Sequence, residues 1–383
     1  MKILHISDLH IGKRVNEKSL MDEQRHILDR ICRITESEKP DAVVMAGDIY
    51  DKAVPSGEAI MLFDSFIVRM NGLCSHLFII SGNHDSAERI AFGSRIMNDR
   101  GIHLSPVYAG KTRPFTISDE HGEVDFYMLP FIRPAQVRQF LSDDEKSEIQ
   151  TYDSAIRKAV ASMGIDKSRR NILICHQFVT GSVRSGSEDA NVGGLDNVDA
   201  SVFEDFDYVA LGHLHRPQDC GTERIRYSGR PLKYSFSEVD DVKSVTIIDL
   251  KEKGSMERKT AVLEPLHDWH DLRGSYEEVT ARDFYIGKGY QEDFVRITLT
   301  DENDIPDAIG KLRSIYHNIL ELRYDNKRTR AGNVAIRSTA EVEKKSPLEL
   351  FAELYRKQNV DVMSPEQEEY LKNILEKMQE EER

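Results

Sequence analysis

The sequence predicts an α/β fold in which parallel β-strands are covered by helices. One observation is that short runs of β-branched and aliphatic residues end at glycine or polar residues, as at 41–46 and 76–81, a pattern typical of buried strands. The other is that amphipathic stretches at 20–36 and 56–70 separate the first three runs. Alternating strands and helices predict a sheet that contains parallel strands. Such sheets bind ligands at the carboxyl ends of their strands.

The predicted elements follow one another in a regular order. The two helices have apolar residues at helical spacing, namely Ile27, Leu28, Ile31 and Ile34 in the first and Ile60, Phe63, Phe66, Ile67 and Met70 in the second. Five predicted strands each precede a polar motif: 3–7, 41–46, 76–81, 171–175 and 208–211. Two later runs, 225–228 and 245–250, are expected to complete the sheets.

Each of the five strands is followed at once by side chains that can bind a metal ion. The motifs are Asp8-Leu9-His10, Gly47-Asp48-Ile49-Tyr50-Asp51, Gly82-Asn83-His84-Asp85, Cys175-His176 and Gly212-His213-Leu214-His215. Carboxylate, imidazole and amide ligands suit divalent ions such as Mn²⁺, Fe²⁺ or Zn²⁺, and the motifs contain enough of them for two ions. The absence of paired thiolates argues against a structural zinc site.

Two ions about 3.5–4 Å apart can activate water and stabilise a phosphoryl displacement. Such a pair needs a bridging carboxylate, and Asp48 is the candidate because it lies between the other ligands in motif order. His84 directly follows Asn83, so we expect it to face the substrate. Asp85 is expected to orient that imidazole and keep it protonated. Asp51 is expected to be structural, bonding nearby backbone N–H groups.

The remaining histidines belong to no motif, so we expect them to be packed or surface residues. They are His5, His26, His76, His103, His121, His267, His270 and His317.

The series D-x-H, G-D-x-x-D, G-N-H-D, H and G-H-x-H resembles that of the calcineurin-like metallophosphoesterases. With residues 227–237 (YSGRPLKYSFS), the chain is similar to the SbcD family, the nuclease subunits of bacterial SbcCD DNA-repair complexes. The resemblance implies a sandwich of mixed β-sheets flanked by helices, a small α+β capping domain and C-terminal helices.

The resemblance also implies a ligand assignment and a cofactor, two Mn²⁺ ions per chain. One ion would be held by Asp8, His10, Asp48 and His215, and the other by Asp48, Asn83, His176 and His213. His84 would contact the scissile phosphate or protonate the leaving oxygen. The chain departs from its relatives at Arg230, where they usually have a small residue. A cation there would contact DNA or point to solvent.

The net negative charge of the chain bears on whether it can bind DNA. The net charge is −14, which by itself argues against broad DNA binding, because that rests on neutralising phosphates. Two divalent ions would reverse the sign locally. Five cations near the motifs are candidate substrate-binding residues, each with the alternative of a solvated surface charge: Lys13, Arg14, Arg89, Arg184 and Arg230. A partner subunit is expected to supply much of the DNA affinity.

Composition indicates a cytoplasmic protein of more than one domain. The 383 residues are expected to form two or more domains. No apolar run approaches the length of a membrane span, and a ligand at position 8 leaves no room for a cleaved signal peptide. The four cysteines have no paired spacing, as expected of reduced thiols.

We predict four segments. Residues 1–265 form the metallophosphoesterase domain. Residues 266–330 form a capping unit with a strand at 294–299, a helix at 306–316 and a strand at 319–323; by resemblance it is a DNA-binding accessory. Residues 331–345 form a polar linker, and 346–383 a helical segment.

The helical segment contains two copies of the same helix-capping motif. Ser346-Pro347 and Ser364-Pro365 are each followed by Glu or Gln at the position that completes a capping box. Each opens an amphipathic helix, with its apolar stripe expected to dock either on this chain or on another protein. Resemblance to the SbcD family favours the second, with the base of the coiled coil of an SbcC-type ATPase as partner.

The sequence therefore predicts a Mn²⁺-dependent DNA exonuclease and endonuclease subunit that cleaves DNA ends and hairpins with an SbcC-type ATPase. By resemblance it would form a homodimer through the phosphoesterase domain, within a heterotetramer. One alternative is a protein phosphatase or cyclic-nucleotide phosphodiesterase, but protein phosphatases of this superfamily have Arg-Gly where this chain has Lys52-Ala53. The other is a non-catalytic scaffold, which would be expected to lack ligands, and none is missing.

Overall fold

The computed structural model describes residues 1–180, 182, 197–329 and five pairs of residues between 351 and 371. The chain divides into two compact units, Met1–Asp268 and Trp269–Arg383. The boundary predicted from the sequence lies three residues earlier, between 265 and 266. The predicted linker 331–345 lies outside the described residues.

The first unit contains a six-stranded sheet in the order β14-β13-β1-β4-β5-β6. Strands β1 (Lys2–Ile6), β4 (Ala42–Ala46), β5 (His76–Ile80) and β6 (Ile102–Leu104) are parallel. Strand β13 (Ser244–Leu250) is antiparallel to β1, and β14 (Met256–Val262) is antiparallel to β13. The four parallel strands are almost entirely buried, which is why they read as continuous apolar runs.

A second six-stranded sheet has the order β11-β12-β10-β9-β8-β7. Strands β8 (Gly122–Leu129), β9 (Arg170–His176), β10 (Tyr208–Gly212) and β12 (Thr222–Tyr227) are parallel. The edge strands β7 (Phe115–Asp119) and β11 (Gln218–Cys220) pair antiparallel to their neighbours. Both sheets are mixed, so the predicted sandwich of mixed sheets is confirmed.

The two sheets face each other across an apolar core. Phe78 on β5 stacks on Phe126 on β8, with ring centroids 4.4 Å apart. Across the same interface, His5 Nδ1 on β1 lies 2.9 Å from the Tyr208 hydroxyl on β10. His5 is therefore a packed core histidine, as expected of a histidine outside the motifs.

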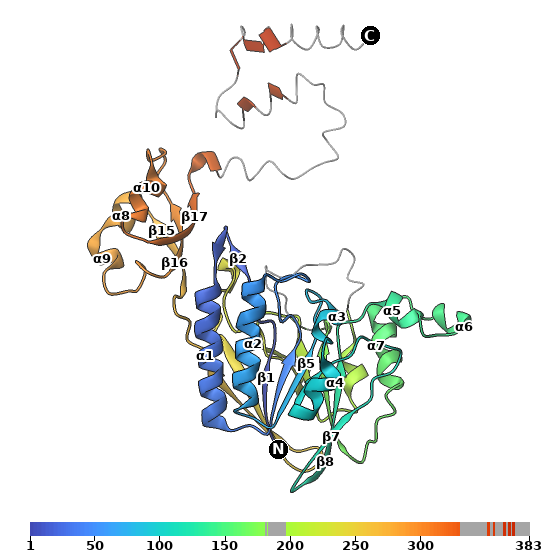
Figure 1. Ribbon diagram of the computed structural model, residues 1–383. Coiled ribbons are helices and arrows are strands. Elements are labelled where there is room, and N and C mark those ends of the chain that lie inside the picture. Colours follow the sequence, from blue (N-terminus) through green and yellow to red (C-terminus); the bar gives the residue numbers. More distant parts are fainter. Residues whose placement is uncertain are drawn as a thin grey trace, which may run out of the picture. The chain divides into compact units, whose positions relative to one another are not determined.

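Helices cover the outer faces (Figure 1). On the first sheet α1 (Met21–Glu38) and α2 (Gly57–Asn71) lie side by side. Helix α2 starts at Ser56, whose hydroxyl accepts the Ala59 N–H at 3.2 Å. Both predicted helices are confirmed, although Ile60 points to solvent and is 45% exposed. On the second sheet α7 (Tyr152–Ala161) buries its apolar face.

Short elements complete the first unit. The hairpin β2 (Arg14–Val15) and β3 (Lys18–Ser19) precedes α1. The short helices are α3 (Ala87–Ile90), α4 (Ser94–Met97), α5 (Pro134–Arg138) and α6 (Asp143–Lys146). The 3₁₀ turns are η1 (Asn98–Arg100), η2 (Ala200–Phe203) and η3 (Phe236–Glu238).

The second unit has a parallel sheet of β15 (Trp269–Gly274), β16 (Phe294–Leu299) and β17 (Asn318–Tyr324). Its helices are α8 (Tyr276–Thr280), α9 (Arg282–Tyr285) and α10 (Ala308–Arg313). The predicted strand–helix–strand order is present as β16, α10 and β17. Strand β15 was not predicted, because its six residues, WHDLRG, include only two large apolar side chains and these do not alternate with the polar ones.

In the C-terminal segment, the Ser364 hydroxyl accepts the Gln367 N–H at 3.3 Å, and the Gln367 side-chain oxygen accepts the Ser364 N–H at 2.9 Å. This is the reciprocal capping box predicted there. The capping residues of the preceding predicted helix, from Ser346, lie outside the described residues. None of the helices in the described part of the chain combines the length and apolar composition that a membrane span requires.

Candidate active site

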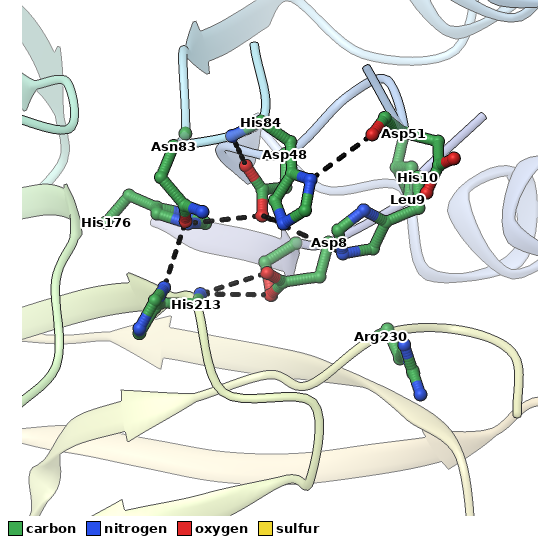
Figure 2. Close-up of polar contacts among 12 residues, drawn as sticks. Asp8, Leu9, His10, Asp48, Asp51, Asn83, His84, His176, His213 and Arg230 are labelled. Atoms are coloured by element: carbon green, nitrogen blue, oxygen red, sulfur yellow. Dashed lines mark hydrogen bonds and ion pairs between the residues drawn. The ribbon is translucent and has the colours of Figure 1, made fainter. Parts of the chain in front are cut away.

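Residues of all five motifs lie close together (Figure 2). Asp8 and His10 follow β1, Asp48 follows β4 and Asn83 follows β5, all in the first sheet. His176 ends β9 and His213 and His215 follow β10, both strands in the second sheet. The site is therefore assembled from both layers.

Asp48 lies at the centre of this cluster. Its Oδ2 atom is 3.7 Å from His10 Nε2 and 3.4 Å from His176 Nε2. Three groups have ligand atoms within 4.8 Å of one another, namely Asp8–His10–His215, His10–Asp48–His84 and Asp8–Asp48–His176. The Asp48 Oδ2 atom thus lies between His10 and His176, which are predicted ligands of different ions. A bridging carboxylate needs this position.

The second set of predicted ligands converges on Asn83. The Asn83 side-chain oxygen is 3.0 Å from His176 Nε2 and 3.0 Å from His213 Nδ1. His176 Nδ1 donates to the carbonyl of Ala46 at 2.7 Å, so Nε2 is the nitrogen with a free lone pair. A hydrogen bond of this kind fixes the tautomer of a metal-binding imidazole.

Backbone strain is concentrated at the ligands. Four of the eight described non-glycine residues with positive φ are Asp8 (55°), His10 (44°), Asp48 (50°) and His213 (103°). Such conformations are costly and persist where the surrounding structure fixes them, often at functional sites.

Glycines before the ligands allow close approach. A Cβ at Gly82 would lie 2.1 Å from Asp48 Oδ1, and one at Gly47 would lie 2.5 Å from His176 Nδ1. At Gly212, a Cβ would lie 1.9 Å from the Ala46 carbonyl oxygen. The glycine at each position is therefore required by packing around the ligands.

Burial and unmet hydrogen bonding show that the residues fit metal ions. Asp8, His10, Asp48, His176 and His215 are each 5% exposed or less. Neither ring nitrogen of His10 has a hydrogen-bond partner, and buried polar atoms rarely lack one. A divalent ion would supply a partner for Nε2, the nitrogen that lies near Asp48. Burial also holds the pKa of His10 and of His215 well below the usual range, which keeps both imidazoles in the neutral, metal-binding form.

The carboxylates of Asp8 and Asp48 and the imidazole of His176 change one another's pKa. Burial raises the pKa of Asp8 to about 7. Burial would also raise the pKa of Asp48, but the imidazoles of His176, His10 and His84 outweigh it and hold that pKa below its usual range. Burial tends to lower the pKa of His176, but Asp48 and Asp8 outweigh it and raise the pKa to about 9. Metal binding would displace these protons.

His84 lies beside the cluster and is held by the backbone. Its Nδ1 lies 3.2 Å from the carbonyl of Asp51, its Nε2 lies 4.0 Å from Asp48 Oδ2, and its side chain is 31% exposed. The imidazole is therefore oriented by a carbonyl and accessible from outside.

The role predicted for Asp85 is corrected. Its carboxylate accepts the backbone N–H groups of Ile49, Tyr50 and Gly82 at 2.9–3.0 Å, so it joins two motif loops instead of orienting His84. Burial, followed by the charge of Asp48, raises its pKa to about 6.

The candidate substrate-binding cations lie in different environments. Lys13 Nζ pairs with the Asp51 carboxylate at 2.7 Å, so Asp51 bonds a side chain where backbone N–H groups were expected. Arg14 lines a pocket of about 360 Å³ together with Asp51 and Lys52. Arg89 is exposed on α3, and Arg184 lies outside the described residues.

The expectation for Arg230 is corrected. Its side chain is 2% exposed, pairs with the buried carboxylate of Glu238, and points away from the metal ligands in Figure 2. It is not available to DNA in this structure.

Three residues that the sequence did not single out contact the backbone of the ligand motifs. They are Gln24, Tyr234 and Lys243. Gln24 and Lys243 carry no local signal, because their partners lie 14 and 28 residues away in the sequence, whereas Tyr234 belongs to the segment 227–237 that carries the family resemblance.

Comparison with known proteins agrees with this geometry. The family model of calcineurin-like phosphoesterases matches residues 1–217. The SbcD subunit of the SbcCD nuclease from Staphylococcus epidermidis is 35% identical over 326 residues, which cover 84% of this chain and 85% of that protein. The chain belongs to the SbcD family of calcineurin-like phosphoesterases. The protein of the same name from Staphylococcus saprophyticus is 34% identical over 326 residues, 84% of each chain.

Two further similarities concern the second unit and the fold. The model of the type 5 capsule protein repressor C-terminal domain matches residues 263–359. A solved dimetal phosphatase from Danio rerio aligns with 69% of this chain and 99% of its own at 12% identity, with a TM-score of 0.37, which is too distant to bear on function. As a member of the SbcD family with every predicted ligand present, the chain is a metal-dependent phosphoesterase of the nuclease class.

Proposed function

We propose that this chain is the Mn²⁺-dependent nuclease subunit of an SbcCD-type complex that cleaves DNA ends and hairpins. The observation that carries the proposal is that Asp48 and the six other proposed ligands, all buried or half-buried, lie together, with His84 beside them. The family supports DNA as the substrate, since its curated members are named as nucleases.

The proposed ligands fall into two sets, one for each metal ion. Asp8, His10, Asp48 and His215 would hold one ion, and Asp48, Asn83, His176 and His213 the other. When bound, two divalent ions stabilise the phosphate charge and activate water for in-line displacement. Nitrogen and oxygen donors without thiolate suit Mn²⁺.

His84 would act on the substrate. Its Nδ1 is directed at the carbonyl of Asp51, which can only accept, so Nδ1 carries a proton. This leaves Nε2 to contact the scissile phosphate or, when protonated, to donate to the leaving oxygen. General acid–base groups contribute about 10²–10⁴-fold to rate.

A substrate panel tests the proposal. The protein is stripped with chelator and given Mn²⁺, Mg²⁺ or Zn²⁺ together with blunt DNA ends, DNA hairpins, a phosphoserine peptide and a cyclic nucleotide. We expect DNA cleavage with Mn²⁺, stimulated by ATP when an SbcC-type partner is present. Turnover of the peptide or cyclic nucleotide without cleavage of DNA would contradict it.

We also propose that the chain forms a homodimer within a heterotetramer. The solvent face of α2 supports this, because Met61 is 71% exposed and Val68 is 67% exposed. Phe92 and Ile96, on the segment that includes α4, are also largely exposed. Exposed apolar side chains that cluster on one element are typical of protein interfaces.

Further parts of the proposal concern the remainder of the chain. The predicted C-terminal helices would dock on the ATPase subunit, and the second unit would assist DNA binding. Arg14 and Arg89 remain candidate contacts for DNA. The cysteines Cys32, Cys74, Cys175 and Cys220 are all free, which supports a cytoplasmic location.

A further inference from the structure

The loop between β12 and β13, residues 228–243, lies behind two metal ligands, and we call it the support loop. His10 and His215 belong with Asp8 to one metal-binding group, and their rings are 5.4 Å apart. The two histidines follow strands of different sheets. Contacts beyond those strands must therefore fix the position of one imidazole relative to the other. The support loop contacts the backbone of His215 and that of Leu9, the residue before His10.

On the His215 side the contact is a buried set of charges. The carbonyl of His215 accepts from Lys243 Nζ at 3.0 Å and from the backbone N–H of Arg230 at 3.2 Å. Glu238, which is fully buried, accepts from Lys243 Nζ at 2.8 Å and from Arg230 Nε at 2.7 Å. Gly229 permits this approach, since its φ is +72° and a Cβ would lie 2.8 Å from the same carbonyl.

On the His10 side the contact is a chain of neutral hydrogen bonds. The Tyr234 hydroxyl donates to the carbonyl of Leu9 at 3.0 Å and accepts from Gln24 Nε2 at 2.7 Å. Gln24 Nε2 also donates to the carbonyl of His10 at 2.7 Å. His10 has a left-handed backbone, with φ 44°, and such a conformation persists only when its neighbours fix it. The guanidinium of Arg230 lies 4.9 Å from the centre of the Tyr234 ring. This contact connects the buried charges beside His215 with the hydrogen bonds beside His10.

We propose that the support loop sets the affinity of the ion held by Asp8, His10 and His215, with Tyr234 and Lys243 as positioning residues. The inference rests on the two-ion site of the proposed function. Groups that orient ligands typically change metal affinity by about 10–100-fold when they are lost. The ligand His176 is oriented from elsewhere, by the carbonyl of Ala46. The effect is therefore confined to one of the two ions.

Metal binding to the full-length protein tests this directly. Tyr234→Phe removes one hydroxyl and keeps the ring. Lys243→Met removes one ammonium and leaves Glu238 paired with Arg230, so no bare charge is buried. Each variant is titrated with Mn²⁺ by calorimetry, and the spin-coupled Mn²⁺ pair is followed by electron paramagnetic resonance.

We expect one Mn²⁺ to bind as in the wild type and the other about 10–100-fold more weakly. The coupled-pair signal should return with excess Mn²⁺, as should hydrolysis of a small phosphodiester. The control is Lys233→Met. That ammonium lies in the same loop but bonds the Val239 carbonyl at 2.7 Å and Asp268 at 2.8 Å. The Lys233→Met variant should bind both ions as the wild type does.

Three results would overturn the inference: two wild-type affinities in both test variants, equal weakening of both ions, or the same weakening in Lys233→Met. Melting temperatures show whether each variant folds, and if Lys243→Met does not, Tyr234→Phe carries the test. A wild-type protein that bound no Mn²⁺ would overturn the proposed function itself, and the inference with it.

Discussion

At the scale of single residues, the site depends on how a few side chains share one small volume. The Oδ2 atom of Asp48 lies within 4 Å of three imidazoles, those of His10, His84 and His176. This proximity is what lowers the carboxyl pKa of Asp48 despite complete burial. The residues proposed to hold metal and His84, which is proposed to act on the substrate, can therefore be tested separately by mutation.

Loss of Asp48 should remove both ions. Because the carboxylate faces ligands of both proposed ions, Asp48→Ala is expected to bind neither tightly and to lose phosphodiester cleavage. Metal content and hydrolysis of a nitrophenyl phosphodiester are measured on the same sample. Asp22→Ala, an exposed acid on α1, is the control and should behave as the wild type. Two tightly held ions with full activity in Asp48→Ala would refute the bridging role.

Loss of His84 should separate chemistry from metal binding. We expect His84→Gln to keep wild-type metal content while DNA cleavage falls by about 10²–10⁴-fold, because its imidazole is held by the Asp51 carbonyl beside the ligands. Elemental analysis and single-turnover cleavage rates give the two quantities. If the variant loses its metal, His84 is a ligand and the assignment changes.

Acid should destabilise the sandwich through His5. Burial, followed by the charge of Arg226, lowers the pKa of His5 to about 3, so the unfolded chain takes up this proton near pH 6.5 and the folded chain does not. Stability should then fall as the pH drops from 6.5 to about 3, by up to about 1.4 kcal/mol per pH unit from this group. In His5→Gln, denaturant unfolding should show a shallower pH dependence. An unchanged slope would show that His5 does not titrate this way.

At the scale of elements, short segments have separable tasks. The motif loops after β1, β4, β5, β9 and β10 hold the ligands, whereas the support loop holds the backbone behind them. The C-terminal segment carries none of the ligands, and its capping box at Ser364 starts an amphipathic pattern. Removing that segment should leave the chemistry intact.

Truncation after Lys345 tests this separation. We expect the shortened chain to keep its metal and its hydrolysis of a small phosphodiester, but to lose binding to an SbcC-type ATPase and ATP-dependent DNA cleavage. Leu371→Asp with Ile374→Asp should act as a milder truncation, because burying a carboxylate in an apolar groove is costly. Pull-down measures the partner. Equal retention of the partner would exclude the docking role, and a truncated chain that fails to fold would indicate that the helices pack on this chain.

At the scale of the whole molecule, the proposed homodimer depends on one exposed surface. Met61 and Val68, on the solvent face of α2, are exposed and take no part in the buried core. A symmetric dimer would bury the same patch on both copies.

Charge placed on this face should therefore produce monomers. We expect Met61→Glu with Val68→Glu to convert a dimer into a monomer while hydrolysis of a small phosphodiester is unchanged, because a buried unpaired charge opposes association. Light scattering after size-exclusion chromatography gives the mass. Ser37→Glu, on the exposed side of α1, should remain dimeric. A monomeric wild type would refute the homodimer.

The sequence by itself determined the local parts of this protein. Apolar runs such as 41–46 specify strands because both faces of the parallel strands are buried, and the polar residues after them specify ligand chemistry. Capping at Ser364 could also be predicted, because an N-cap bond spans only three residues. Strand β15 could not, because its sequence, WHDLRG, has neither an apolar run nor a strict alternation of apolar and polar residues.

Only the tertiary structure decided which side chain meets which. His176 bonds the carbonyl of Ala46, 130 residues away, and Tyr234 bonds that of Leu9, 225 residues away. Asp85 bonds backbone N–H groups and not His84, for which it was predicted, and Arg230, a candidate contact for DNA or a solvated charge, pairs with buried Glu238. The physical reason is that periodicity records only whether a residue is buried. The partner of a buried polar group is set by how the two sheets pack.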